Sequence, residues 1–380
     1  METVIVKIDE KNIDSIESVG ALEHAGEILR KGGLVAFPTE TVYGLGGDAL
    51  DPEASKKIYS AKGRPSDNPL IVHVADKADV DGIVVDIPEK GKKLMDIFWP
   101  GPLTLIFRKN DRVPYETTGG LDTVAVRNPS NKVARELFRH CNGYVAAPSA
   151  NLSGHPSPTT AEHVNNDLNG LVDMIIDGGA SDCGLESTIV DVTVDPPMIL
   201  RPGFVTKEML EEAVGEVVID KAIIDPDSNI RPKAPGMKYR HYAPRAELVI
   251  VEGELEKVRK KITEQVVNDI AFGKKVGVIL MDDEITGREW ADDLLTKNID
   301  SSKTVFGLDT GDDDSSVIRI AYIGKKENVS VVAAKLYSVL RDYDKIDIDR
   351  IYSEAVDDVG VGAAVMNRLI KAAGHQIIRV

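Results

Sequence analysis

The alternation of apolar and polar positions predicts strands mixed with helices over residues 1 to about 210. Short apolar runs have the length of buried strands, and longer segments repeat apolar residues every three to four positions, as one face of a helix does. This mixture favours one α/β domain with a large sheet, in which short connections imply some antiparallel pairs. We expect strands at 34–37, 70–74, 103–107, 123–126, 144–147, 174–176 and 187–192, and helices at 16–31, 52–61, 91–98, 131–140, 160–167 and 206–214.

A second alternating pattern begins near Ala246. It predicts strands at 246–251, 275–281, 303–306 and 350–354, and helices at 254–272, 329–343 and 362–373. Strands that alternate with helices favour a parallel, Rossmann-like sheet. We therefore expect a larger α/β domain over 1–215 and a smaller α/β domain over 246–380, joined by a segment over 216–245.

The joining segment is unusual in composition. Its prolines and its glycine, from Arg231 to Pro244, disfavour helix and sheet, which is typical of an interdomain linker. A plain linker has no need of two tyrosines, a histidine and four cations, whereas a linker that folds over a ligand has. The residues alone leave both interpretations open.

The charge, the cysteine content and the apolar runs of the chain argue against several classes of protein. The net charge of the 380 residues is -16, which argues against free nucleic acid as a partner of the whole surface. The two cysteines, Cys141 and Cys183, lack metal-site spacing and suggest a reducing compartment. No apolar run has the length to span a bilayer, and residues 1–10 lack the apolar core of a signal peptide. We expect a cytoplasmic protein.

The richest candidate chemistry follows the first predicted buried strand. The stretch Phe37-Pro-Thr-Glu-Thr-Val-Tyr-Gly-Leu-Gly46 offers hydroxyls, one carboxylate and glycines that let a ligand approach the backbone. A predicted helix follows, and then Lys62-Gly-Arg-Pro65 and Asn68. Hydroxyls, close backbone and two cations after a strand are suited to a polyanion such as a triphosphate.

Three further clusters could join this site. Thr123 and Arg127 share one face of a strand, and Arg127 is either an ordinary surface arginine or a clamp for a carboxylate. Residues 146–157 supply hydroxyl and amide groups that suit phosphate or hydrated Mg²⁺, or simply cap a turn. The fourth cluster is Gly184-Leu-Glu-Ser-Thr188 with Leu200-Arg-Pro-Gly203.

Neither a catalytic triad nor a Gly-x-x-x-x-Gly-Lys-Thr phosphate loop is evident. His73 lies inside a predicted strand, where a lone histidine is usually a core or rim residue. A site rich in Arg, Lys, Ser and Thr without a clear nucleophile fits positioning and charge neutralisation. Phosphoryl or nucleotidyl transfer is chemistry of that kind.

These motifs resemble a known family. Lys62-x-Arg64 with Ser149-x-Asn151 resembles the signature of the threonylcarbamoyl-AMP synthases, and residues 37–45 and 100–105 match as well. The segment Pro235–Pro244 and the C-terminal region resemble the longer, two-domain Sua5 form more than the single-domain YrdC form. The resemblance covers nearly the whole chain. It implies a YrdC-like twisted mixed sheet with helices, followed by a smaller Rossmann-like α/β domain.

The resemblance also implies a reaction. Such nucleotidyltransferases join L-threonine, bicarbonate or CO2, and ATP with its Mg²⁺, and they release pyrophosphate and L-threonylcarbamoyladenylate. Threonylcarbamoyl transferase machinery then modifies adenosine 37 of tRNAs that read ANN codons. The resemblance leaves the choice between bicarbonate and CO2 open. It implies no membrane partner and no direct tRNA binding.

Site residues carry over position by position. The catalytic charges would be Lys62 and Arg64. The L-threonine contacts would be Thr41, His73, Arg127 and Ser187. The ATP contacts would be Arg64, Asn68, Thr123, Ala147, Ser149, Asn151, Ser157, Arg201 and Tyr239, with Tyr242 as the alternative linker tyrosine. No protein side chain is expected to bind a metal directly.

Two rival functions are weaker. The acidity of the chain argues against a double-stranded-RNA-binding module. A carbamoyl-phosphate-using transferase of hydrogenase maturation would carry zinc-finger-like and acylphosphatase regions, whereas this sequence has two cysteines and shows no such region.

Overall fold

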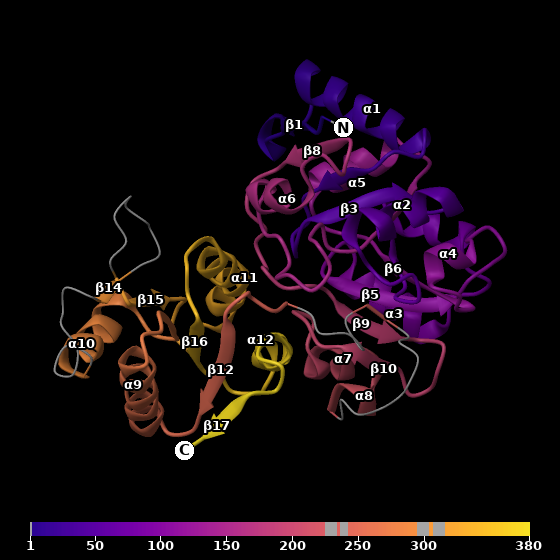
Figure 1. Cartoon of the computed structure of the whole chain (residues 1–380). Helices are drawn as coiled ribbons and strands as arrows, with labels where there is room; N and C mark the ends of the chain where they lie inside the picture. The colour runs from indigo at the N-terminus through magenta and orange to yellow at the C-terminus, as the bar shows by residue number, and fades with distance from the viewer. Residues whose placement is uncertain (1, 225–233, 236–241, 295–303, 307–315) are drawn as a thin grey trace. The chain divides into compact units, whose positions relative to one another are not determined.

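The computed structural model describes residues 2–224, 234–235, 242–294, 304–306 and 316–380. The chain divides into two compact units (Figure 1). The first contains residues 1–153 and 157–239, and the second contains 154–156 and 240–380.

The first unit is built on a mixed sheet of 11 strands, in the order β1-β8-β2-β3-β7-β4-β6-β5-β9-β10-β11. Parallel and antiparallel pairs alternate irregularly across it. The strands are β1 (Val4–Lys7), β2 (Val35–Phe37), β3 (Gly44–Asp48), β4 (Ile71–Val74), β5 (Leu103–Arg108), β6 (Thr123–Arg127), β7 (Tyr144–Ala147), β8 (Met174–Asp177), β9 (Thr188–Asp191), β10 (Met198–Arg201) and β11 (Val218–Ile219).

The helices of this unit include the six that the sequence predicts. They are α1 (Ile16–Arg30), α2 (Pro52–Lys62), α3 (Glu89–Phe98), α5 (Lys132–Arg139), α6 (Ala161–Leu168) and α7 (Lys207–Val214), joined by the short α4 (Tyr115–Thr118) and α8 (Lys221–Ile224) and the 3₁₀ turns η1 (Glu10–Asn12) and η2 (Lys77–Gly82). Local chemistry sets their ends. In α2, for example, the Asp51 side chain caps the first turn and Gly63, at φ 59°, ends the helix in the left-handed region.

Four strands of this sheet, β1, β3, β10 and β11, lie outside the ranges that the sequence predicts, and β3 is unusual in composition. Three of the five residues of β3 are glycines, which normally weaken a strand. A Cβ at Gly44 would lie 2.9 Å from the ring of Phe37, and one at Gly46 would lie 2.7 Å from Val145. Glycine is therefore required for close packing, and ladder bonds to β2 and β7 hold the strand.

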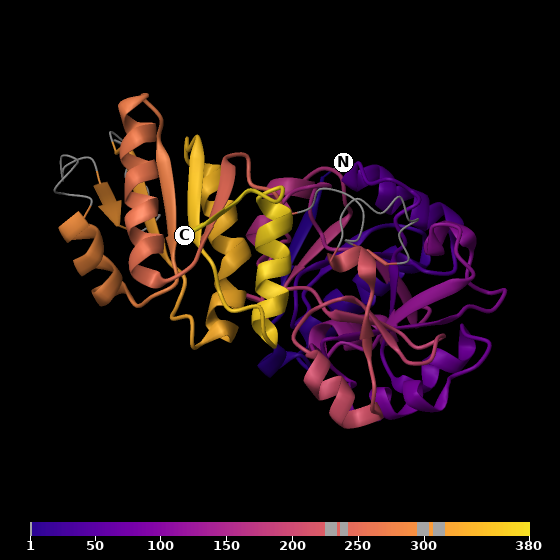
Figure 2. The same ribbon diagram turned by 90° about the horizontal axis from the view of Figure 1, so that it is seen from below.

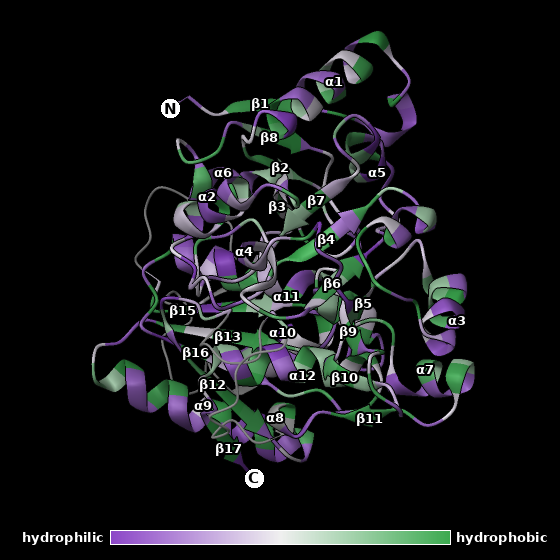
Figure 3. Cartoon of the chain, turned by 90° about the vertical axis from the view of Figure 1, so that its right-hand side faces the viewer, coloured by the Kyte–Doolittle hydropathy of each residue, from purple (hydrophilic) through white to green (hydrophobic). Residues whose placement is uncertain are grey.

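The two faces of the sheet are covered differently. One face packs against α2, α3, α6 and α7 through a large apolar core that includes Ile58, Leu94, Val164 and Leu210. On the other face, α1 and α5 cover only the region of β2, β7 and β8. Strands β4 and β6 are largely hydrophobic in Figure 3, as expected for central strands buried on both faces.

The remaining part of the second face carries a smaller apolar cluster. Ile71, Ile106, Ala125, Ile189 and Leu200 point from β4, β5, β6, β9 and β10. Ala234, in the joining segment, packs against them and is fully buried. This described part of the segment therefore lies on the same face as the predicted site.

The second unit is a parallel sheet of six strands in the order β14-β15-β13-β16-β12-β17. Helix α9 packs on one face, and α11 and α12 lie on the other (Figure 2). The strands are β12 (Glu247–Glu252), β13 (Val276–Leu280), β14 (Thr304–Phe306), β15 (Ile318–Tyr322), β16 (Arg350–Glu354) and β17 (Ile377–Arg379), and the helices are α9 (Leu255–Ala271), α10 (Glu284–Leu294), α11 (Val329–Lys345) and α12 (Val361–Ala372). The predicted fold class, a large mixed sheet followed by a Rossmann-like domain, is confirmed.

A helix crossing in the first unit gives a stability test. A Cβ at Gly26 of α1 would lie 2.2 Å from the carbonyl oxygen of His140, whereas a Cβ at Gly20 of the same helix meets nothing within 4 Å. We expect Gly26→Ala to lower the free energy of unfolding by about 1–3 kcal/mol, because backbone must move. Gly20→Ala should raise it by about 0.5–1 kcal/mol through helix propensity alone. Denaturant unfolding measures both, and equal effects would contradict the crossing geometry.

Candidate functional site

A row of polar side chains crosses the part of the sheet that helices leave uncovered. On β6, Arg127 pairs with His73 of β4 and with Thr104 of β5. Directly opposed residues in neighbouring strands point to the same face. All three are buried, so a cation, an imidazole and a hydroxyl lie side by side in the sheet.

Two loop residues meet Arg127 from above the sheet. Its Nη1 donates to Thr41 Oγ1 at 2.8 Å, and its Nη2 lies 2.8 Å from Glu40 Oε1. The loop is braced internally, since Thr39 Oγ1 donates to the Val42 carbonyl and accepts from the Val42 amide. The hairpin between β2 and β3 thus aims one hydroxyl and one carboxylate at one guanidinium.

His73 is held as a neutral ring. Burial, assisted by the charge of Arg127, lowers its pKa from 6.5 to about 3. Its Nδ1 lies 3.1 Å from the Ile71 carbonyl, and the backbone of Val145 is a second hydrogen-bond partner of the ring. A neutral imidazole carries one donor nitrogen and one acceptor nitrogen.

Ser187 extends the row toward β9 and β10. Its Oγ hydrogen-bonds Thr104 Oγ1 at 2.7 Å and accepts from Arg201 Nη2 at 3.1 Å. Arg201 Nε also donates to the Ser187 carbonyl at 3.0 Å. A second buried cation, Arg201, is therefore connected through the hydroxyls of Ser187 and Thr104 to the strand position beside Arg127.

The loop after β7 is tied to α2 by a buried lysine. Lys62 Nζ donates to the carbonyls of Ser149, at 2.5 Å, and Asn151. Ser149 Oγ also hydrogen-bonds Asn151 Oδ1 at 2.5 Å. Ala147, the last residue of β7, leads into this loop. Lys62 therefore fixes the loop shape in addition to bringing charge.

Arg64 and Asn68 share the turn after α2. Arg64 donates to the carbonyls of Asn68 and Pro69, at 3.3 and 3.2 Å, and no described residue donates to the buried Asn68 Oδ1. Thr123 is the first residue of β6 and lies at the opposite end of this strand from Arg127.

Ser157 is fully buried and donates to Glu186 Oε1 at 2.5 Å. The segment that contains it is joined to the first loop, because the Tyr43 amide donates to the Pro158 carbonyl. Tyr239 lies outside the described residues. The alternative, Tyr242, has φ 65°, is buried, and its ring centroid lies 5.3 Å from that of Tyr337 in the second unit.

The structure therefore joins most of the predicted residues into two connected groups. Thr41, His73, Arg127, Ser187 and Arg201 form the row across the sheet, and Lys62, Ser149 and Asn151 form the loop. Sequence reasoning missed Glu40, Thr104 and Glu186, which contact these residues. Glu40 lies inside the first motif and Thr104 in the segment 100–105, so their positions carried a signal, but their partners are distant in sequence.

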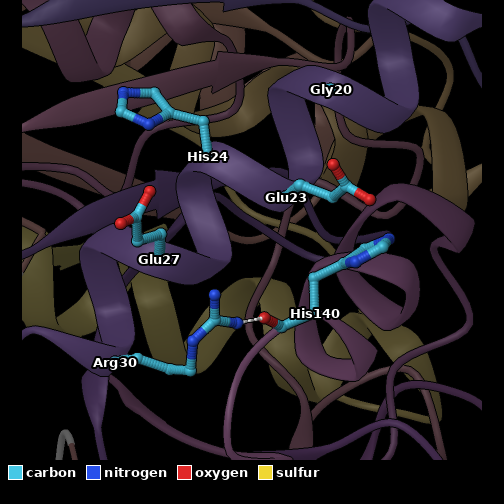
Figure 4. A pocket seen from close by; sticks show the side chains of 6 residues that line it. All are labelled: Gly20, Glu23, His24, Glu27, Arg30 and His140. Carbon is cyan, nitrogen blue, oxygen red and sulfur yellow. Dashed lines mark hydrogen bonds between the residues drawn. The ribbon is translucent and has the colours of Figure 1, made fainter.

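A hollow of about 530 Å³ lies elsewhere on the first unit (Figure 4). Gly20, Glu23, His24, Glu27 and Arg30 of α1 line it together with His140. Arg30 Nη1 donates to the His140 carbonyl, which fixes α1 against the end of α5. The hollow shares no residue with the row or the loop.

Comparisons with known proteins identify the family of this chain. Residues 27–203 match the family described as "Telomere recombination", and residues 205–374 match "Threonylcarbamoyl-AMP synthase, C-terminal domain". A threonylcarbamoyl-AMP synthase of Pyrococcus abyssi is 45% identical over 94% of this chain and 95% of its own length. The chain belongs to the threonylcarbamoyl-AMP synthases.

Two further comparisons support this family membership. The enzyme of Bacillus subtilis is 44% identical over 94% of both chains. A crystal structure of Pyrococcus abyssi Sua5 complexed with L-threonine superposes with a TM-score of 0.85 at 43% identity, over all of both chains. The resemblance to the two-domain Sua5 form is thereby confirmed. Within the described residues, no helix is long and apolar enough to cross a membrane.

The buried ring of His73 gives a pH test. Below pH 6.5 the unfolded chain binds a proton at His73, whereas the folded chain binds this proton only near pH 3. Stability is therefore lost as the pH falls through this window, by about 1.4 kcal/mol per pH unit. His73→Gln should remove that part of the slope of the unfolding free energy against pH.

Urea unfolding between about pH 6.5 and 5 measures this slope. In a Trp290→Phe background, Trp99 fluorescence reports on the first unit alone. The exposed His24 on α1 supplies a matched control, and His24→Gln should leave the slope unchanged. An unaltered slope in His73→Gln would contradict the neutral, buried ring.

Proposed function

We propose that this protein is an L-threonylcarbamoyl-AMP synthase. It joins L-threonine, bicarbonate or CO2, and ATP, and it releases pyrophosphate. The observation that carries the proposal is the buried row of His73, Arg127 and Thr104, reached by Thr41, in a chain that matches synthases of that name over both domains. A sheet seldom buries a cation and a neutral imidazole together unless they serve a ligand.

The row is suited to an amino acid with a hydroxyl side chain. A guanidinium binds a carboxylate through two parallel hydrogen bonds, so Arg127 would hold the α-carboxylate. The neutral His73 and the hydroxyls of Thr41 and Ser187 then surround the remaining groups of L-threonine. Binding in this orientation directs the carbamate oxygen toward the α-phosphorus of ATP.

The loop and the turn after α2 are suited to the nucleotide. Lys62 and Arg64 would neutralise charge as the carbamate oxygen bonds to the α-phosphorus and the bond to the pyrophosphate oxygen breaks. Arg201, Asn68, Thr123, Ala147, Ser149, Asn151 and Ser157 would hold the remainder of ATP, with Tyr239 or Tyr242 from the joining segment.

Mg²⁺ would enter with ATP as part of the substrate. Within the described residues, no group of three or more His, Cys, Asp or Glu side chains is arranged to hold a metal ion. The donors around the loop are hydroxyls, amides and cations, which suit the phosphates of an ATP complex. This chain's own residues bind and orient that complex.

The product would pass to a threonylcarbamoyl transferase that modifies adenosine 37 of tRNAs reading ANN codons. The net charge of -16 fits a protein that leaves tRNA binding to that partner. The two free thiols, Cys141 and Cys183, fit a reducing, cytoplasmic setting.

Pyrophosphate release tests the reaction. With ATP and Mg²⁺, release should require both L-threonine and bicarbonate. Arg64→Ala should lower turnover by about 10²-fold or more, the scale of losing one preorganised charge contact. Lys62→Ala should lower it at least as much, because the loop carbonyls also lose their donor.

Arg139→Ala is the control for these variants. Arg139 is an exposed cation of α5 that pairs with Asp76 and Glu136, so its loss should leave turnover unchanged. Release that ignores threonine, or near-normal turnover in both Lys62→Ala and Arg64→Ala, would refute the assignment.

A further inference from the structure

Glu40 is a buried carboxylate to which the described residues donate few hydrogen bonds. It lies between Thr39 and Thr41, and its side chain is only 8% exposed. The loop backbone around it is fixed, because the Cys183 amide donates to the Glu40 carbonyl at 2.7 Å and Ser181 Oγ donates to the Thr39 carbonyl at 2.9 Å. The position of this side chain is therefore set by the fold, and among the described residues its ion-pair partner is Arg127.

The ion pair between Glu40 and Arg127 leaves hydrogen-bonding capacity unused. Both carboxylate oxygens of Glu40, and Nε and Nη2 of Arg127, are buried and lack hydrogen-bond partners among the described residues. A carboxylate can accept about four hydrogen bonds and a guanidinium can donate five. Burying such a pair costs more than the attraction returns unless further hydrogen bonds complete it. Stability alone therefore does not explain why the pair is there.

An α-amino acid supplies what the pair lacks. Its carboxylate and its ammonium group are attached to one carbon, so they can meet a guanidinium and a carboxylate that lie side by side. Resting on the function proposed above, Arg127 takes the α-carboxylate of L-threonine. We propose that Glu40 binds the α-ammonium group of the substrate and accepts its proton.

The reaction needs such an acceptor. An ammonium nitrogen has no lone pair, so L-threonine cannot add to CO2 or bicarbonate until it loses a proton. In the proposed step one N–H bond breaks, the proton forms an O–H bond on Glu40, and the electron pair remains on nitrogen. Glu40 returns the proton to solvent before the next turnover.

The surroundings of Glu40 suit this role. Among the described residues, the charged and titratable groups that face it are Arg127 on β6 and Cys183. Burial first, and then the charge of Glu40, raise the pKa of the Cys183 thiol to about 12, so this thiol stays protonated. His73 stays neutral beyond Arg127. The ammonium proton therefore finds one anionic acceptor.

Ligand binding separates this role from mere support of Arg127. The probe is (3R)-3-hydroxybutanoate, which keeps the carboxylate and the hydroxyl of L-threonine but lacks its ammonium group. In Glu40→Gln, calorimetry should show the Kd for L-threonine rising by about tenfold or more, the scale of a lost charge-assisted hydrogen bond. The Kd for the probe should stay the same or fall, because Arg127 loses its competing anion.

Turnover gives a second readout. Glu40→Gln should lower kcat/KM for L-threonine, and the loss should shrink as the pH rises and more substrate arrives as free amine. Glu40→Asp keeps the charge and should recover threonine binding relative to Glu40→Gln. Asp191→Asn, which removes a buried carboxylate that accepts hydrogen bonds from Thr193, should change neither ligand's affinity.

Three results would overturn the proposal. Equal weakening of L-threonine and the probe would show that Glu40 only positions Arg127. Unchanged binding and turnover would show that it has no part in the site. Loss of kcat/KM with no dependence on pH would remove the proton-accepting role. A wild-type protein without threonine-dependent pyrophosphate release would instead refute the function proposed above, and the two Kd values remain measurable in that case.

Discussion

The burial of one guanidinium in the middle of a sheet governs the arrangement of the first unit. Arg127 is 4% exposed, and a charge removed from water must be compensated where it lies. Compensation comes from the loop above the sheet, through Thr41 and Glu40. The neighbouring strands place His73 and Thr104 on either side of Arg127. Strands β4, β5 and β6 and the β2–β3 hairpin must therefore keep their register for this cation to remain buried.

The sheet separates stability from chemistry. Its fully covered face holds the large apolar core, to which four of the longer helices contribute. On its other face, α1 and α5 cover the region of β2, β7 and β8, and the polar row lies on the neighbouring strands β4, β5 and β6. The small cluster around Ile71 and Ala234 closes the far side of that row. The row is thus enclosed by apolar packing on two sides, which lowers the local dielectric and strengthens its electrostatic interactions.

Much of the fold could be predicted from the sequence, because the period of apolar residues is a local signal. All seven strands expected in the first unit are present, and β16 has the bounds that the sequence predicts. Strands β1, β10, β11, β15 and β17 and helix α10 were not predicted. β3 was missed because its glycines are dictated by Phe37 and Val145, which only the folded sheet brings near.

The same limit applies to the site. The shared face of Thr123 and Arg127 follows from a period of two along one strand. The contacts of Arg127 with Glu40 and Thr41, and of Thr104 with Ser187, join residues more than 80 positions apart, and the sequence gives no register for them. Nor does a basic residue in a motif reveal its partners, as Lys62 shows by holding two backbone carbonyls.

The close packing of the β2–β3 hairpin limits which amino acids this part of the chain can carry. Gly44 and Gly46 have no space for even a methyl group, so residue choice at these positions is set by sterics and not by catalysis. The motif around Gly44 and Gly46 therefore reflects close packing as well as chemistry. Swapping its polar residues alters what the protein can bind, whereas swapping its glycines alters whether the polar residues arrive at all. Libraries that diversify the whole stretch would conflate these two kinds of failure, and holding both glycines fixed would separate them.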